Sequence, residues 1–295
     1  MTDQSKLKIW FDSFRPKTLT ASVAPVLIGA AMAYGDGYLD PLVLILTFAA
    51  TLLIQIGTNL ANDYYDFKKG ADSETRVGPT RATQAGLVTP NQMKLAFLLT
   101  FALAAACGLY LVYKGGIPIL AIGLVSIICG ILYTAGPVPL AYNGLADIFV
   151  LVFFGPVAVG GTYYLQANSI NPSVIIAGLA PGLFSVAILT VNNFRDIETD
   201  KAANKKTLAV RFGPNFAVAE YITTIMTACL IPGLICILNR SNRWSMISML
   251  ALLIALPLIR KILSKPDPDT LNRMLAKTGL LLVSYSILFS GGWII

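Results

Sequence analysis

Residues 42–61 read LVLILTFAATLLIQIGTNLA, a run without a charged side chain, and residues 62–67 continue as NDYYDF. An α-helix needs about 20 apolar residues to cross the hydrocarbon core of a bilayer, which is the length of this run. A membrane β-strand would alternate between apolar and polar residues, and this run does not. It is therefore predicted to be a transmembrane helix that places two carboxylates where it leaves the membrane.

The rest of the chain has the same apolar character. Of its 295 residues, 56% are hydrophobic and 13% are charged, whereas soluble domains carry roughly 25% charged residues. Because so few charges cannot cover a water-facing surface, lipid is predicted to surround most of the chain. The fold class is therefore predicted to be all-α, a polytopic membrane protein formed by a single domain over residues 1–295.

Hydropathy windows of about 19 residues predict nine transmembrane helices. Their approximate ranges are 19–35, 41–61, 94–113, 117–134, 145–165, 173–192, 216–238, 244–262 and 277–295.

The basic residues predict the orientation of these helices. Of 22 Lys and Arg residues, all but Lys114, Arg240 and Arg243 fall on the side that holds the N-terminus. Because cytoplasmic loops carry the excess of positive charge, the N-terminus and the long loops are predicted to be cytoplasmic. After nine crossings, the C-terminus is predicted to lie outside. The net charge of +7 is thus a signal of topology, and without a soluble basic module no nucleic-acid partner is expected.

Two short windows, residues 62–74 and 192–200, hold seven of the 15 acidic residues. Each window begins where a predicted helix ends. If the helices continue, residues four positions apart share a face, as Asn62 and Asp66 would. The second window repeats this spacing in Asn192, Asp196 and Asp200.

The chemistry of these windows indicates a metal-bridged anion. Stacked carboxylates repel one another unless cations neutralise them, and oxygen ligands of this kind suit Mg²⁺. Because Mg²⁺ prefers to share phosphate oxygens, a bound diphosphate is predicted. The alternative is a pair of solvated helix ends, although ionisable groups at membrane depth are usually functional. The chain has no His, so a general base must be Asp, Glu, Tyr, Lys or water.

Basic residues follow each acidic window, and two explanations of them stay open. They would hold phosphate oxygens that a metal does not reach, or they would only keep the loops on the cytoplasmic side. They are Lys68, Lys69, Arg76 and Arg81 after the first window, and Lys201, Lys205, Lys206 and Arg211 after the second.

The two windows lie 130 residues apart, from 62 to 192, and each follows an even-numbered helix. This spacing favours a degenerate internal duplication. The pseudo-repeat halves would cover roughly 15–140 and 141–295 and would face one another across a central chamber.

At these residues the chain resembles the UbiA superfamily of intramembrane prenyltransferases, whose members carry an NDxxD-type motif after helix two and a DxxxD motif after helix six. The likeness covers nearly the whole chain. Residues 15–19 (RPKTL), 70–81 (GADSETRVGPTR) and 192–196 (NNFRD) look most like the menaquinone-pathway branch, which acts on 1,4-dihydroxy-2-naphthoate.

The resemblance implies a nine-helix bundle in a bacterial inner membrane, with a chamber open sideways to lipid. It implies that polyprenyl diphosphate is bound through Mg²⁺, with two ions expected. The prenyl chain would be transferred to 1,4-dihydroxy-2-naphthoate with loss of CO₂ and diphosphate, which gives demethylmenaquinone. Membrane lipid is the expected surrounding partner.

The resemblance also assigns residues to roles, position by position. The residues that would hold the metal are Asn62, Asp63, Asp66, Asp72, Asn192, Asp196 and Asp200. The side chain of Asp63 is also compatible with pointing away from the metal. The catalytic residues would be Asp66, Asp72, Asp196 and Asp200. Arg15, Lys68, Arg76 and Lys206 would bind the diphosphate. Arg81, Tyr133 and Asn193 would bind the acceptor. Asp72 or Glu74 would take a proton, and Arg76 or Arg81 would pair with the acceptor carboxylate.

Two positions depart from the family pattern. Many relatives have a third acidic residue where this chain has Gly70, and the acid comes at Asp72 instead. Several relatives place a Lys four residues after the tyrosine, where this chain has Pro137. The ligand role of Asp72 and the diphosphate contact of Tyr133 are therefore less directly implied.

Two kinds of alternative function stay open. A UbiA-type enzyme with another acceptor, such as 4-hydroxybenzoate, homogentisate or a chlorophyllide, would share the diphosphate chemistry. A secondary transporter would also have repeated halves and broken helices, but its ionisable residues would lie near mid-membrane, whereas here they cluster at helix ends.

Overall fold

The computed structural model describes residues 5–70, 78, 80–137, 139–239 and 243–295, and regular structure in this part is helical, without a strand. Eight helical segments there are long and apolar enough to cross a membrane, which confirms the predicted fold class. The helices are α1 (Lys6–Ser13), α2 (Pro16–Gly35), α3 (Pro41–Lys68), α4 (Pro90–Leu132), α5 (Ala146–Val152), α6 (Ala158–Ala167), α7 (Pro172–Arg195), α8 (Ile197–Ala202), α9 (Leu208–Phe212), α10 (Pro214–Asn239), α11 (Ala251–Leu263) and α12 (Pro268–Ile294). Two 3₁₀-helices cover Leu140–Tyr142 and Arg243–Leu250, and a π-helical turn covers Phe153–Val157.

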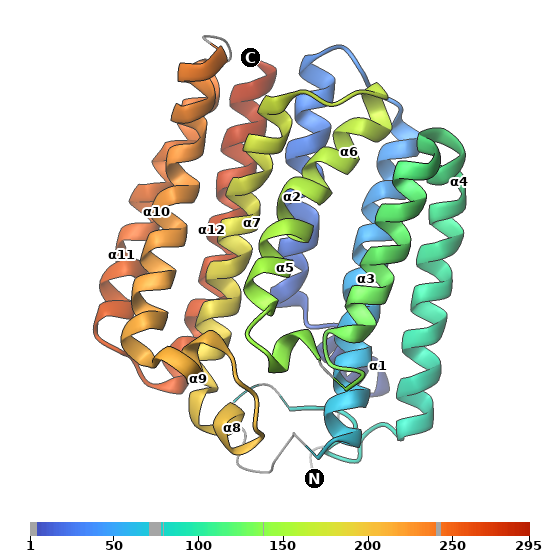
Figure 1. The fold of residues 1–295 in the computed structure, drawn as a ribbon, viewed down its shortest axis with the longest axis vertical. Coiled ribbons are helices and arrows are strands. Elements are labelled where there is room, and N and C mark those ends of the chain that lie inside the picture. The colour runs from blue at the N-terminus through green and yellow to red at the C-terminus, as the bar shows by residue number, and fades with distance from the viewer. Residues whose placement is uncertain (1–4, 71–77, 79, 138, 240–242) are drawn as a thin grey trace.

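Helix α4 is too long for one crossing of the membrane. At about 1.5 Å per residue, its 43 residues would extend to roughly twice the hydrocarbon thickness of about 30 Å. Gly116 breaks the helix with φ 66° and ψ −153°, a conformation that is essentially restricted to glycine. Figure 1 shows the two arms running side by side in opposite directions. They correspond to the predicted helices at 94–113 and 117–134, so the described chain makes nine crossings.

The predicted helix at 145–165 is interrupted in its middle. Within the π-helical turn between α5 and α6, Gly155 departs from helical geometry and Pro156 has no backbone N–H to donate. This turn packs on α7 backbone to backbone. A Cβ atom on Gly178 would stand 2.7 Å from Pro156 Cα, and one on Gly155 would stand 2.8 Å from the Gly178 carbonyl oxygen. The contact fixes the place of α5 in the bundle.

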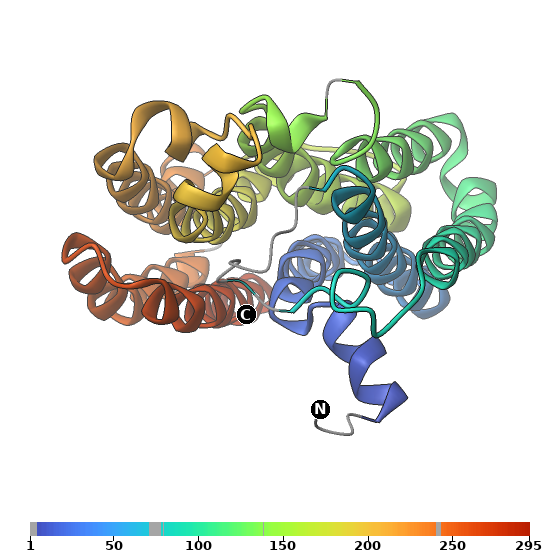
Figure 2. The same cartoon turned by 90° about the horizontal axis from the view of Figure 1, so that it is seen from below.

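The helices surround the space into which the site opens. The largest group of buried side chains lies among α2, α6, α7, α10, α11 and α12, and a second lies between α3 and α4, around Leu60, Phe97 and Phe101. Figure 2 shows α10 to α12 on one side and α3 and α4 on the other, with α2 and α7 between them. Because α2 packs into the core of the C-terminal half, the halves are interlocked. Their origin as pseudo-repeats stays a prediction.

The long connections share one face of the bundle. Helix α1, the last turn of α3, and helices α8 and α9 lie at the same end, whereas α12 finishes at the opposite end (Figure 1). This arrangement agrees with the prediction that the N-terminus and the long loops lie on one side. Which face is cytoplasmic stays a prediction, because the bundle alone has no marker of the membrane side.

Candidate active site

Both acidic windows open on a single cavity of about 550 Å³. Its wall is formed mainly by α2 to α7, together with the segments that follow α4 and α8. The two sets of oxygen ligands therefore share one hollow, as the sequence pattern predicted. Those on its wall are Asn62, Asp66, Asn192, Asp196 and Asp200.

Asp66 is the more enclosed of the two described carboxylates of the first window, with 1% of its surface exposed. The Tyr142 hydroxyl donates to its Oδ1 at 2.9 Å, and Arg81 Nη2 donates to its Oδ2 at 3.4 Å. Lys205 Nζ lies 3.4 Å from both oxygens. These three partners come from three separate segments, so Asp66 ties together the loops that surround the entrance of the cavity.

Asn62 lies one turn before Asp66 on the same face of α3, because the helix continues to Lys68. Its side chain is buried, and its Oδ1 accepts no hydrogen bond from any described residue. A buried amide oxygen without a partner is costly, and here it belongs to a residue on the cavity wall. It is the kind of donor atom that a hard cation would take.

Asp63 has a different role from the one that the motif suggested. Its carboxylate accepts the backbone N–H groups of Ala82 at 3.1 Å and Thr83 at 3.3 Å, and the residue is not on the cavity wall. It therefore holds the loop that carries Arg81. The physical reason is the helix period: Asp63 is one residue from Asn62 and so points about 100° away from it.

The second window is organised by Arg195, which is buried at the end of α7. Its guanidinium donates to both carboxylate oxygens of Asp196, at 2.7 and 2.6 Å. It also donates to Asn192 Oδ1 at 2.8 Å and to Asn272 Oδ1 on α12 at 2.6 Å. Two predicted ligands are thus oriented by one planar fork, a geometry that Lys does not provide. The sequence analysis missed this residue, although Arg between two acidic-window ligands was a visible signal.

Helix α7 ends at the first acidic residue of the second window. Asp196 has φ −97° and ψ 10°, and it separates α7 from α8. Nevertheless, Asn192, Asp196 and Asp200 all remain on the cavity wall. The predicted shared face therefore survives the interruption of the helix.

Of the basic residues predicted to bind the diphosphate, Arg15 lies on the cavity wall and Lys206 does not. Arg15 lies on the cavity wall, in a left-handed conformation with φ 55° just before α2, and its Nη2 donates to the Asn59 carbonyl oxygen at 3.4 Å. Lys206 is exposed and lies off the wall, where its backbone N–H donates to the Tyr142 carbonyl oxygen at 2.9 Å. Its neighbour Lys205 is the lysine on the wall, and the assignment of Lys206 is corrected accordingly.

Of the other predicted site residues near the end of α3, only Lys68 lies within the described residues. Lys68 is exposed at the end of α3 and lies off the cavity wall. Asp72 and Arg76 lie outside the described residues, as does Glu74.

Tyr142, which the sequence analysis did not name, lies between two lysines. The Nζ atoms of Lys69 and Lys205 are each 4.9 Å from the centre of its ring. Lys69 Nζ also donates to the Thr134 carbonyl oxygen at 2.6 Å. Partial burial lowers the pKa of Lys69, while the charge of Asp66 opposes that shift. The ring thus lies beside two positive charges, while the hydroxyl binds Asp66 of the first window.

The residues predicted to bind the acceptor all lie on the cavity wall: they are Arg81, Tyr133 and Asn193. Arg81 and Asn193 are buried. Burial raises the pKa of the Tyr133 phenol above its ordinary value, and the charge of Asp147 adds to the shift.

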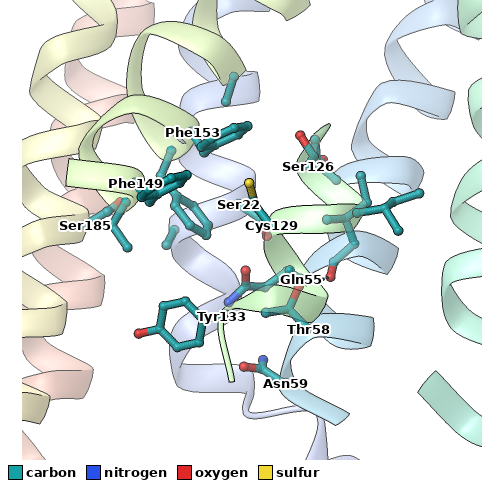
Figure 3. Close-up of a pocket in the computed structure, with 18 of the residues that line it drawn as sticks. Ser22, Gln55, Thr58, Asn59, Ser126, Cys129, Tyr133, Phe149, Phe153 and Ser185 are labelled. Atoms are coloured by element: carbon teal, nitrogen blue, oxygen red, sulfur yellow. Dashed lines mark hydrogen bonds between the residues drawn. The ribbon is translucent and has the colours of Figure 1, made fainter. Parts of the chain in front are cut away.

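The interior of the cavity changes from polar to apolar. In Figure 3, Asn59 and Tyr133 lie toward one end of the pocket, and Phe149 and Phe153 lie toward the other. The two phenylalanine rings are stacked with their centres 6.1 Å apart. A ligand with a charged head and an apolar tail matches this gradient.

The chain is similar to known membrane prenyltransferases. The profile of the UbiA prenyltransferase family matches residues 22–284. The chain is 38% identical to a 1,4-dihydroxy-2-naphthoate octaprenyltransferase of Escherichia coli, over 94% of this chain and 93% of the relative. It is 35% identical to a protein of the same name from Haemophilus influenzae, over 98% and 97% of the two chains.

One solved structure shows the same fold. A UbiA homologue from Archaeoglobus fulgidus, bound to GPP and Mg²⁺, superposes with a TM-score of 0.69 at 17% identity. The match covers 96% of this chain and 99% of that one.

Proposed function

The chain belongs to the UbiA prenyltransferase family, and on this premise we propose that it transfers a polyprenyl chain from polyprenyl diphosphate to 1,4-dihydroxy-2-naphthoate. CO₂ and diphosphate leave, and the product is demethylmenaquinol, from which demethylmenaquinone arises by a separate two-electron oxidation. The observation that carries the proposal is the single cavity on which both oxygen clusters open. The choice of acceptor is supported by relatives whose names specify this naphthoate.

We propose Mg²⁺ as the cofactor: no three acidic side chains of the described residues gather into a complete metal site, but Mg²⁺ is held by one or two carboxylates together with substrate phosphates. The unpartnered Asn62 Oδ1 and the carboxylates of Asp66, Asp196 and Asp200 supply hard oxygen atoms on one wall. We assign one ion to each window, with Asp72 as a further ligand of the first. The Mg²⁺ in the Archaeoglobus fulgidus homologue supports this use of the fold. When bound, the metal would stabilise the charge that builds on the leaving diphosphate.

The protein's own side chains position the metal ligands and supply positive charge for the leaving diphosphate. Arg195 holds Asp196 and Asn192 in place through its charged hydrogen bonds. Lys205 and Arg15 place positive charge on the cavity wall, where preorganised charges favour departure of an anionic group. The apolar end of the cavity excludes water, which protects the allylic cation from hydrolysis.

Three residues are proposed to orient the acceptor. Arg81 pairs with its carboxylate, while Tyr133 and Asn193 donate or accept hydrogen bonds at its ring oxygens. All three face the cavity on the side where Asp66 lies, because Arg81 contacts Asp66 directly. The acceptor ring would therefore lie between the diphosphate and the apolar end.

The protein is integral to a membrane by its apolar helices, and we propose the bacterial inner membrane with the site facing the cytoplasm. This orientation follows from the basic residues on the face of α1, α8 and α9. The polyprenyl diphosphate then reaches the site from two sides. The diphosphate head comes from the cytoplasmic face and the tail from lipid.

The test offers the purified protein labelled polyprenyl diphosphate with each candidate acceptor in turn, and measures prenylated product and CO₂. We expect product and equimolar CO₂ with 1,4-dihydroxy-2-naphthoate. Prenylation of 4-hydroxybenzoate alone, without release of CO₂, would show that the acceptor is wrong. Absence of transfer to every acceptor would contradict the enzymatic proposal itself.

A further inference from the structure

Asp147 is a carboxylate on the cavity wall that the roles assigned so far do not use. It lies in the first turn of α5, and 7% of its surface is exposed. Neither of its side-chain oxygens accepts a hydrogen bond from another residue in the described part of the chain. A buried carboxylate left in this state destabilises a fold, so its presence calls for a use.

Four other carboxylates in or near the cavity, within the described residues, are partnered. Asp66 and Asp196 have the ion pairs described above, and Asp200 is also engaged. Glu220 on α10 lies off the cavity wall and accepts a hydrogen bond from Thr190 at 3.1 Å. Asp147 therefore differs from each of them: it lines the cavity, yet neither of its oxygens has a hydrogen-bond partner among the described residues.

The position of Asp147 suits contact with an aromatic acceptor. Its charge acts on the phenol of Tyr133, which lies at the polar end of the pocket (Figure 3). Phe149 follows on α5 and Phe153 begins the π-helical turn after it, and both line the apolar part. Asp147 thus lies between the region assigned to the diphosphate and the region assigned to the tail.

We propose that Asp147 takes the proton from the ring hydroxyl next to the acceptor's carboxylate while the new carbon–carbon bond forms. This inference rests on the proposed function and deepens it. Carboxylates serve as general bases when they lie within hydrogen-bond reach of the proton. Asp147 replaces Asp72 and Glu74, which the sequence suggested for this role.

The step balances without any additional reagent. The prenyl carbon–oxygen bond breaks, and its electron pair leaves with the diphosphate. The hydroxyl proton moves to Asp147, its electron pair forms a ring carbonyl, and the carboxylate-bearing ring carbon bonds to the prenyl carbon. The bond to the carboxylate then breaks, CO₂ leaves, and its electron pair returns to the ring. Asp147 gives the proton back to the ring oxygen, so it ends as it began.

The first test compares Asp147→Asn with Glu220→Gln, a matched change at a carboxylate off the cavity wall. General-base catalysis contributes roughly 10²- to 10⁴-fold, so we expect Asp147→Asn to lower kcat by about that factor. Binding of the prenyl diphosphate in the absence of acceptor should keep its wild-type Kd. Glu220→Gln should keep kcat within about threefold of wild type, and Asp147→Glu should recover part of the lost rate.

A second measurement separates catalysis from folding. Because Asp147→Asn removes an unpartnered buried charge, its Tm in detergent should equal or exceed the wild-type value. A third uses the acceptor whose hydroxyl next to the carboxylate is a methyl ether, which has no proton to transfer. With this acceptor the wild-type and Asp147→Asn rates should converge.

The possible failures are distinguishable. If the wild type does not prenylate the naphthoate, the proposed function fails and this inference fails with it. If the wild type is active and Asp147→Asn keeps kcat within about threefold, Asp147 is not the base. If Asp147→Asn instead loses affinity for the prenyl diphosphate, the residue belongs to the diphosphate site and the inference is overturned.

Discussion

Asp66 and Asp63 show what the sequence can predict about single residues. The helix period predicts that Asn62 and Asp66 share a face, and the cavity wall agrees; the motif counted Asp63 among the metal ligands, and this was wrong, because its carboxylate accepts from the backbone of Ala82. The same reasoning does not separate Lys205 from Lys206. These two lie between α8 and α9, where no regular period fixes which side chain turns inward. Arg195 was missed for a different reason: its position between Asn192 and Asp196 was visible, but the pattern did not show that its guanidinium turns back to hold both of them and Asn272 on α12.

The two adjacent lysines provide a matched test at this scale. Lys205→Met should raise KM for the prenyl diphosphate or lower kcat by about 10- to 100-fold, because one charged hydrogen bond is worth roughly 1.5–3 kcal/mol. Lys206→Met should remain close to wild type, since that side chain is exposed and off the wall. Steady-state kinetics with varied prenyl diphosphate measures both. Equal losses in the two variants would contradict the placement of the site lysine.

Of the two breaks in the long helices, the sequence predicts the one in α4 but not the one between α5 and α6. The reversal at Gly116 was predictable, because Lys114 and two glycines interrupt the apolar run there. The break at Gly155 was not, because the run from 148 to 165 contains no charged residue and a membrane helix often tolerates a proline. Its cause is tertiary. The backbone of this turn meets α7 at Gly178, and hydropathy contains no information about that contact.

Gly178 should therefore be intolerant of even one added methyl group. Gly178→Ala would place a Cβ atom 2.7 Å from Pro156 Cα, and overpacking of this kind costs about 1–3 kcal/mol. Gly291→Ala on α12 is the control, because its Cβ would meet nothing within 4 Å and Ala favours a helix over Gly. Thermal unfolding of the detergent-purified variants should show a lower Tm only for Gly178→Ala. A Tm equal to that of the control would show that α5 and α7 are packed more loosely.

At the scale of the whole molecule, the sequence predicted the membrane class, the nine crossings and the face on which the site lies. It did not predict that α2 packs among α6, α7 and α12. Helices that face lipid on one side and protein on the other are apolar all round, so their pattern does not name their neighbours. The shared chamber follows from this packing, and only the pairing of the two acidic windows pointed to it.

Removal of divalent ions tests the chamber as a unit. Incubation with EDTA should abolish transfer, and addition of excess Mg²⁺ should restore it, because two groups of carboxylates then face a diphosphate without a neutralising cation. The measurement is labelled product formed by one sample before chelation, after chelation and after Mg²⁺ is returned. Full activity in EDTA would show that Arg15, Arg195 and Lys205 suffice for the diphosphate.

The size of the cavity has a consequence for the length of the quinone side chain. About 550 Å³ is the volume of a pocket for a drug-sized molecule, and a long polyprenyl tail exceeds it. Most of the isoprene units must therefore pass between the helices and remain dissolved among the acyl chains throughout turnover. A cavity wall that contacts only the first few isoprene units cannot select the total length of the prenyl chain. The tail length of the quinone is then decided earlier, by the enzyme that synthesises the diphosphate.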